Sequence, residues 1–512
     1  MFEHEEKVKV LLITYALYCS YKIGMSWDEG YYHEIGKINL KYLLSFGQID
    51  EPFFMKERYS TLYWSVSSLV SQIFPGQFKL EVYHIINTLL GLMTIVGLYK
   101  ITKFLFNKEI AKISSLFLFF TPFFFGHLAI NNKDIILAFA HVWIIYYIYK
   151  YTFNYLDSKK RLVIIFKISL LAALGTGIQL LFLGSLIPII LIFLTVMLLK
   201  KKNLKTIFSD FLIFLFSFLT ILILFWVDTH SNIFLKPIEI LVRSFSMKIG
   251  WPFNLVNGNY YFSNDLPYDY LLKNYIYKLP EYLIFLYIFS IPVLFLNFEI
   301  LKKKFKNTKI IISLIVILLI YPSIIMAIIP YSIYDGLRLF LWSAPYLVVI
   351  PSITAYVIFL NKSYFYNIIK IFILILFVLN ILNFLTITPY HYTYLNLFSG
   401  KKENRYQKFE NDYWSTSLKE LILSSDLGDG KINFYSCGVS SEITKIYMKK
   451  KYKRSEYTTK EQANYIIMTN RSIFSKKDNK ITNCYDEYTS RNVHQVYRNG
   501  IVLSAIKQIN NE

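Results

Sequence analysis

The stretch Met25-Ser26-Trp27-Asp28-Glu29-Gly30-Tyr31-Tyr32 follows directly on the first apolar run of the chain, residues 8–24. That run is long enough to cross a bilayer. Two adjacent carboxylates at the mouth of a membrane span are costly unless they meet water, a cation or a reaction. Asp28 and Glu29 therefore indicate either a solvated loop or a functional site, and the rest of the chain has to decide between the two.

The composition is that of a polytopic membrane protein. Of 512 residues, 55% are hydrophobic, 18% are aromatic and only 17% are charged, and the mean hydropathy is +0.40. The formal net charge is +21, but the basic residues fall in short clusters between apolar runs. Clusters of this kind orient a chain in the membrane, so they argue against a nucleic-acid partner.

Basic clusters and apolar runs together predict about eleven spans of ~20 residues each. Lys7 and Lys9 precede the first span, which places the N-terminus in the cytoplasm and Asp28-Glu29 outside. Between the basic clusters at 159–161 and 200–202 the number of crossings must be even. The chain therefore makes two short spans there, turning near 175–177 or Gly184. Segments between the first two long spans read as amphipathic helices on the outer membrane surface.

After Pro389 the sequence takes on a soluble α/β pattern. Residues 431–435 and 464–469 read as strands, 441–451 as a helix, and 494–507 as a hairpin turning at Asn499-Gly500. The predicted fold is a polytopic all-α membrane protein with a small C-terminal extracytoplasmic α/β domain. Its predicted parts are a transmembrane catalytic domain, 1–388, and the extracytoplasmic domain, 389–512.

The chain has only three cysteines, Cys19, Cys437 and Cys484, which excludes a disulfide framework and a cysteine metal cluster. Cys437 and Cys484 both fall in the predicted outer domain, where an oxidising compartment permits a bridge. The sequence leaves open whether they form one. No pair of histidines has the spacing of metal ligands, so we do not expect a dedicated zinc site.

The predicted topology gathers the unusual polar residues on the outer face: Asp28, Glu29, Lys56, Arg58, His127, Lys133, Asp134, Asp335 and Arg338. Acids and bases together at one membrane surface suit an anionic, amphiphilic substrate such as a lipid-linked phosphosugar. Its phosphate requires Arg or Lys, and an attacking hydroxyl or amine must lose its proton to a nearby carboxylate.

An Asp-Glu pair in the first outer loop, an acid in the second loop, and about eleven spans before an outer domain resemble the C-type (GT-C) glycosyltransferase superfamily. The protein O-mannosyltransferases and the bacterial aminoarabinose and core-sugar transferases are the most similar members. Further stretches resemble a bacterial branch of this group: Phe124-Phe125-Gly126-His127 with Asn132-Lys133-Asp134, Ile333-Tyr334-Asp335-Gly336-Leu337-Arg338, and the segment from Pro389-Tyr390 to Asn396 with Glu410-Asn411-Asp412-Tyr413-Trp414.

The resemblance implies that Asp28 is the catalytic base and that Asp134 is the second-loop acid. The sequence departs from the family at Gln179, where a basic residue is expected, and at Glu51-Pro52-Phe53, where the phosphate loop usually reads apolar-Pro-Pro. Lys56 and Arg58 therefore match the family's phosphate-binding residues in charge, but the loop sequence before them differs from the family's.

Each assignment has a structural alternative. Asp28 and Asp134 could cap helices, and Glu29 could orient an acceptor or a metal, or simply be solvated. Asp335 lies in an Asp-Gly turn, and Arg338 could snorkel to the membrane surface instead of binding phosphate. In the predicted site, Asp28, Glu29 and Asp134 are assigned to catalysis, and the residues assigned to substrate binding are Lys56, Arg58, His127, Lys133, Asp335 and Arg338.

The predicted function is transfer of a hexose or pentose from a polyprenyl phosphate to a lipid, glycan or protein acceptor. The reaction is expected at the outer face of the cytoplasmic (inner) membrane, among membrane lipids. A divalent cation is the only cofactor left open, and the sugar, the acceptor and the oligomeric state are not determined. The alternatives are a transporter or flippase of lipid-linked sugars, and a non-catalytic membrane scaffold. Transporters place polar groups near mid-membrane, whereas the centres of these spans are almost free of charge.

Overall fold

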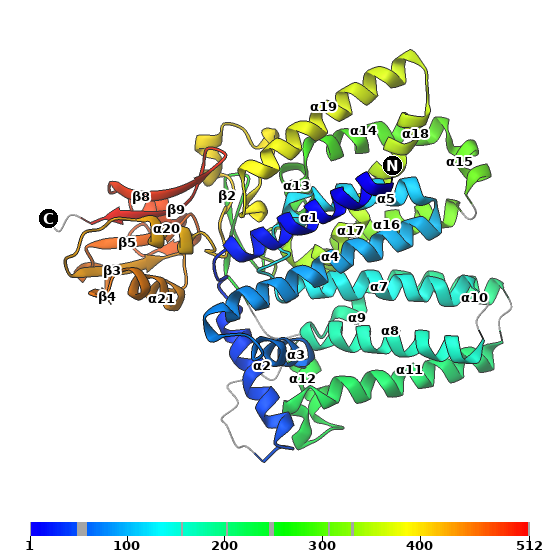
Figure 1. Ribbon diagram of the computed structural model, residues 1–512, viewed down its shortest axis with the longest axis horizontal. Helices are drawn as coiled ribbons and strands as arrows, with labels where there is room; N and C mark the ends of the chain where they lie inside the picture. The colour runs from blue at the N-terminus through cyan, green and yellow to red at the C-terminus, as the bar shows by residue number, and fades with distance from the viewer. Residues whose placement is uncertain are drawn as a thin grey trace.

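The computed structural model describes residues 2–48, 59–154, 157–200, 203–244, 250–305, 308–328 and 332–509. Lys56 and Arg58, two of the predicted phosphate ligands, lie outside the described residues. In the described part, long helices run side by side and a smaller α/β region lies at one end of them (Figure 1).

Among the described residues, seven helical segments are long and apolar enough to cross a membrane, or eight if the bent pair α13 and α14 counts as one span. Helices suit this role because every backbone polar group finds its partner inside the segment. Five of the segments are single helices: α7 (Asp134–Phe153), α8 (Ser158–Ile178), α11 (Leu204–Leu224), α16 (Thr308–Ile328) and α19 (Tyr364–Thr386). The sixth is α4 (Lys79–Leu105), preceded by η1 (Gly76–Phe78). The seventh is the run of η3 (Arg338–Ser343), α17 (Ala344–Leu347) and α18 (Val349–Leu360). The protein is therefore a mostly helical, multipass membrane protein.

Four further helices occupy segments that the sequence analysis counted as spans: α1 (Phe2–Lys22), α5 (Lys108–Phe119), α10 (Ile187–Leu199) and α14 (Glu281–Leu296). Three of them have 12, 13 and 16 residues, and α1 has 21 residues but carries several charged ones. The count of eleven spans stays a prediction.

Small residues let neighbouring spans approach closely. A Cβ atom added at Gly97 of α4 would lie 2.7 Å from Val142 Cγ1 of α7, and Trp143 donates its indole N–H to the carbonyl of Met93 at 3.0 Å. Close backbone approach of this kind is typical of helix pairs in membranes. Spans α11, α16 and α19 leave much apolar surface exposed, as helices that face lipid do.

Shorter elements fill the connections between the long helices. The short α-helices are α2 (Glu29–Leu44), α3 (Leu62–Ser71), α6 (Pro122–Phe125), α9 (Phe182–Ser185), α12 (Lys236–Ser244), α13 (Tyr270–Lys278), α15 (Phe298–Lys304), α20 (Leu418–Ser424), α21 (Ser441–Lys451) and α22 (Cys484–Glu487). The remaining 3₁₀ turns are η2 (Val227–Ser231), η4 (His391–Thr393), η5 (Leu397–Ser399), η6 (Lys402–Gln407) and η7 (Lys460–Gln462). As predicted, the apolar run between the basic clusters breaks into two helices, with α9 between them.

The α/β region is built on a five-stranded sheet with the order β4-β3-β5-β9-β8. Strand β3 pairs in parallel with β4 and β5, whereas β9 is antiparallel to β5 and β8. The strands of the protein are β1 (Phe253–Val256), β2 (Asn259–Phe262), β3 (Ile432–Cys437), β4 (Ser455–Tyr457), β5 (Tyr465–Thr469), β6 (Ser472–Ser475), β7 (Lys480–Asn483), β8 (Asn492–Arg498) and β9 (Ile501–Gln508).

The local predictions for this region are confirmed. β3, α21 and β5 occupy the predicted segments, and β8 and β9 form the predicted hairpin. Asn499 (φ 51°) and Gly500 (φ 77°) both adopt the positive φ that a two-residue hairpin turn of type I′ requires.

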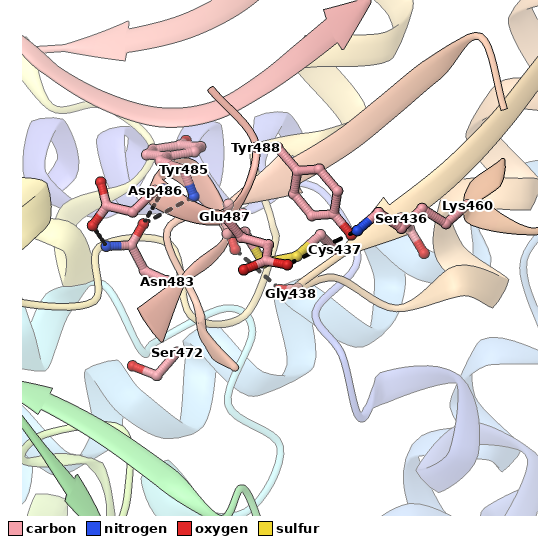
Figure 2. Close-up of a disulfide and its surroundings, with 12 residues drawn as sticks. Ser436, Cys437, Gly438, Lys460, Ser472, Asn483, Tyr485, Asp486, Glu487 and Tyr488 are labelled. Carbon is pink, nitrogen blue, oxygen red and sulfur yellow. Dashed lines mark hydrogen bonds and ion pairs between the residues drawn. A yellow bond between two sulfur atoms is a disulfide. The ribbon is translucent and has the colours of Figure 1, made fainter. Parts of the chain in front are cut away.

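Cys437 and Cys484, whose pairing the sequence left open, form a disulfide. The bond joins the end of β3 to α22, and Asn483 caps α22 by accepting hydrogen bonds from the backbone N–H groups of Tyr485 and Asp486 (Figure 2). The disulfide therefore fixes the small hairpin and helix that follow β5 onto the sheet.

The core of the α/β region continues into the loops of the helical part. Ile23, Ile130 and Tyr392 belong to the same buried cluster as Leu418 and Phe434. In addition, the Met25 backbone N–H donates to the Tyr447 hydroxyl at 3.0 Å. The first loop, from Met25 onward, is thus packed between the helices and the α/β region.

Candidate functional site

A cluster of buried charges lies where the first loop, the start of α7, the segment before η3 and the α/β region meet. Arg338 is its centre and is only 3% exposed. Its Nε donates to Asp134 Oδ2 at 3.0 Å and its Nη1 to Asp335 Oδ2 at 2.7 Å, while Nη2 lies 3.9 Å from Asp28 Oδ2. The planar guanidinium thus joins three of the predicted site carboxylates, a geometry that a lysine cannot reproduce.

A second arginine enters the cluster from the α/β region. Arg471 is the second residue after β5, and its Nη1 donates to Asp335 Oδ1 at 2.6 Å and lies 3.7 Å from Glu410 Oε2. The guanidinium also lies over the Trp251 ring at 4.7 Å. Burial raises the pKa of Glu410, although the Arg471 charge lowers it. Arg471 was not predicted as a site residue, although a charged residue just beyond a buried strand is a usable signal.

The segment 410–414, which the family resemblance singled out, supplies aromatic walls to the cluster. Trp414 Nε1 donates to Asp335 Oδ2 at 3.3 Å, and its ring lies 4.6 Å from the Arg338 guanidinium carbon. The Tyr413 hydroxyl and His127 Nε2 are 3.1 Å apart. Burial lowers the pKa of His127 well below its ordinary value, and the charges of Arg338 and Lys278 lower it further. His127 is therefore neutral near pH 7.

The adjacent carboxylates of the first loop have opposite environments. The Asp28 side chain is 43% exposed, and its ion pair is the 3.9 Å approach to Arg338. Glu29 is 1% exposed, lies 2.9 Å from His84 Nε2 and accepts the Ser26 backbone N–H at 2.5 Å. The Glu29 side chain thus points toward α4, whereas the Asp28 side chain lies at the exposed edge of the cluster. Sequence reasoning did not foresee His84 as the partner of Glu29.

Asp134 and Lys133 open α7 but point to different partners. Asp134 Oδ2 accepts from the Asn131 side chain at 2.9 Å, and the Asp134 backbone N–H donates to Asn131 Oδ1 at 2.7 Å. Lys133 Nζ donates to the Tyr59 hydroxyl at 2.9 Å and lies over the Tyr59 and Tyr32 rings at 4.7 and 5.4 Å. Within the described residues, Lys133 makes no ion pair with a carboxylate, so its charge is available to an anionic ligand.

The Asp335-Gly336 turn brings a further lysine into the cluster. Both residues have positive φ, +62° and +66°, and a Cβ at Gly336 would lie 2.2 Å from Lys278 Nζ. The positive φ at position 336 favours glycine, and the missing side chain leaves room for the Lys278 ammonium. Lys278 is 6% exposed and lies over the Tyr413 ring at 5.7 Å. Nothing in the sequence marked it as a site residue.

The arrangement can orient a carboxylate and hold an anion. Of the predicted site residues, Asp28, Asp134, Asp335 and Arg338 come together, His127 and Lys133 flank them, and Glu29 turns away. Among the described residues, no three metal-ligating side chains group closely enough to hold an ion.

The fold and the site together define a multipass membrane protein with buried charges where its helices meet an α/β region. Residues 62–228 match a family described as dolichyl-phosphate-mannose-protein mannosyltransferase. The apo structure of ArnT from Cupriavidus metallidurans aligns with a TM-score of 0.54 at 11% identity over 98% of both chains. Its complex with undecaprenyl phosphate aligns with a TM-score of 0.52, at the same identity and coverage.

No curated protein matches the chain by sequence. The chain nevertheless shares its fold with ArnT and a stretch of its sequence with the mannosyltransferase family, and both belong to the GT-C superfamily. The resemblance predicted from the sequence is confirmed.

Proposed function

We propose that the protein transfers a sugar from a polyprenyl phosphate to an acceptor, with Asp28 as the general base. The observation that carries the proposal is the position of Asp28, a partly exposed carboxylate at the edge of a cluster whose other carboxylates are buried and paired. A base must reach its substrate, and Asp28 is the site acid that meets this condition. The undecaprenyl phosphate bound by ArnT, which has the same fold, supports the choice of donor class.

In the proposed reaction, the acceptor hydroxyl or amine gives its proton to Asp28 as it attacks the anomeric carbon. The bond between that carbon and the phosphate oxygen breaks, its electron pair stays on the lipid phosphate, and the configuration inverts. Arg338 acts as a positioning residue, since Nε and Nη1 hold Asp134 and Asp335 while Nη2 faces Asp28. Such orientation lowers the barrier because the reacting groups are held before the reaction begins.

The lipid phosphate is assigned chiefly to Lys133, because two of the Arg338 nitrogens already serve carboxylates. Among the described residues, the Lys133 ammonium contacts the Tyr59 hydroxyl and the faces of the Tyr59 and Tyr32 rings. Lys56 and Arg58, from the segment outside the described residues, complete the proposed anion site. A lysine that pairs with no carboxylate suits a phosphate, because its ammonium group is a compact point charge.

We further propose that residues 1–388 form the catalytic membrane domain and 389–512 an extracytoplasmic domain. The N-terminus is then cytoplasmic, and the cluster faces the outer surface of the cytoplasmic membrane. The positions of the basic clusters between the spans support this orientation.

The test is cleavage of a polyprenyl-phosphate sugar by the purified protein, supplied with a cell-envelope extract as the acceptor pool. Asp28→Asn keeps the size of the side chain but cannot take a proton, so turnover should fall by ~10²–10⁴-fold while donor binding persists. Free polyprenyl phosphate and the glycosylated product are followed by mass spectrometry.

Glu29→Gln is the matched control, since it removes the neighbouring charge where the side chain meets His84. We expect Glu29→Gln to reduce thermal stability more than Asp28→Asn does, and turnover less. An Asp28→Asn protein with wild-type folding and wild-type turnover would refute Asp28 as the base. Movement of the intact donor across a vesicle membrane without cleavage would favour the transporter hypothesis instead.

A further inference from the structure

A groove lies away from the charge cluster, where the C-terminal ends of α1 and α19 meet the α/β region. It has a volume of about 470 Å³ and is lined by Tyr18, Lys22, Thr388, Pro389, Tyr390, Lys419, Glu420, Leu423, Ser424 and Arg498. We call it the basic groove. Figure 1 shows the C-terminal ends of α1 and α19, which border it, next to the α/β region.

The cations of the basic groove exceed its anions. Arg498 pairs with Glu420 at 2.5 Å, and Lys419 lies 3.6 Å from Glu81. Lys22, at the end of α1, is exposed, and among the described residues it makes no ion pair; its ammonium lies 5.8 Å from the Tyr18 ring.

A further cation, Lys450 of α21, does not line the groove but lies close enough to Lys419 for its charge to act on it. Burial lowers the pKa of Lys419, the Glu81 charge raises it, and the charges of Lys450 and Lys22 lower it further. The charges of Lys22 and Lys450 both repel the Lys419 ammonium, and an anion in the groove beside Lys419 would offset that repulsion.

The apolar side of the groove continues along the membrane helices. Tyr18 of α1 and Leu382 and Leu385 of α19 are between 49% and 54% exposed. A ligand with a charged head and hydrocarbon chains therefore meets cations at its head and apolar side chains below. A small water-soluble anion would contact the cations but not the apolar side chains.

We propose that the basic groove binds the phosphate headgroup of an anionic phospholipid, whose acyl chains lie along α1 and α19. Such a lipid would fix the α/β region to the membrane surface, because α20 and β8 supply one wall of the groove and the membrane helices the other.

The experiment measures binding of dioctanoyl phosphatidylglycerol to the full-length protein in an uncharged detergent, by calorimetry. Dioctanoyl phosphatidylcholine and inorganic phosphate are the comparison ligands. Each lysine near an anionic lipid surface contributes about fivefold to affinity. Lys22→Gln should therefore weaken phosphatidylglycerol binding about fivefold, and Lys22→Gln with Lys419→Gln about 30-fold.

Lys476→Gln with Lys477→Gln is the matched control, since it removes two exposed lysines between β6 and β7, away from the groove. It should leave the affinity unchanged. Lys22→Gln alone keeps the test valid if the double variant unfolds, because Lys22 makes no ion pair in the described part. Unchanged affinity in Lys22→Gln would overturn the proposal. Equal affinity for phosphatidylcholine, or inorganic phosphate binding as tightly as phosphatidylglycerol, would also overturn it.

Discussion

Replacing Arg338 by lysine tests whether a guanidinium is needed to hold the site together. The side chain is buried, donates to Asp134 at 3.0 Å and to Asp335 at 2.7 Å, and has its third nitrogen 3.9 Å from Asp28. A lysine keeps the positive charge but replaces three spread nitrogens by one ammonium group. It can satisfy one of the two buried carboxylates well, but not both at these positions.

The magnitude follows from the bond that is lost. A hydrogen bond to a charged group contributes about 1.5–3 kcal/mol, so the free energy of unfolding should fall by about that amount. Turnover should fall by about 10²-fold, because a base displaced by ~1 Å loses roughly that factor. Arg338→Ala is a poorer test, since leaving buried carboxylates without a cation costs about 3–5 kcal/mol and can prevent folding.

Arg471→Lys is the control for this experiment. Arg471 shares Asp335 with Arg338, but its ion pairs are with Asp335 and Glu410 and not with Asp28 or Asp134. We expect a similar loss of thermal stability in the two variants and a clearly smaller loss of turnover in Arg471→Lys. Equal turnover losses, or wild-type turnover in a folded Arg338→Lys protein, would refute the positioning role of Arg338.

Two further predictions concern the anion site and the disulfide. Lys133→Gln should raise the KM for the donor by about 10- to 150-fold, the equivalent of one charge-assisted hydrogen bond, and change kcat less; a selective loss of kcat would contradict phosphate binding by Lys133. Replacing both Cys437 and Cys484 by serine should lower the free energy of unfolding by about 2–4 kcal/mol, because the bond closes a separation of 47 residues. Unfolding curves that do not change on reduction of the wild-type protein would contradict the second prediction.

Much of the fold could be predicted because its signals are local. Apolar runs and basic clusters marked the helices, and the alternation of β3 and β5 and the Asn499-Gly500 turn marked the sheet. The number of true spans could not be settled in this way, because α5 and α10 are short and α1 is charged. Length and composition alone do not decide whether such helices cross a bilayer.

Within the site, the sequence indicated the loops but not the partners. Asp28 and Glu29 look equivalent as neighbours in the sequence, yet of the two only Glu29 meets His84, which comes from α4. Arg471 and Asp335 are separated by 136 residues. Ion pairs of such long separation depend on how the α/β region docks, which local patterns do not contain.

The balance of the buried charges explains why Asp28 in particular is suited to act as a base. Asp134, Asp335 and Glu410 are buried beside the buried cations Arg338, Arg471 and Lys278. The cluster is therefore close to neutral before Asp28 is counted, and only the Asp28 carboxylate combines a cationic neighbour with substantial exposure. Because buried charges are tolerated only when they are paired, the cluster is a rigid support, and two of its cations, Arg338 and Arg471, are engaged with carboxylates. In the proposed site, a donor phosphate then finds its countercharge chiefly in Lys133, together with Lys56 and Arg58. If the proposal is correct, base and phosphate ligands thus belong to separate sets of residues, and substitutions in one set should alter turnover while those in the other alter donor binding.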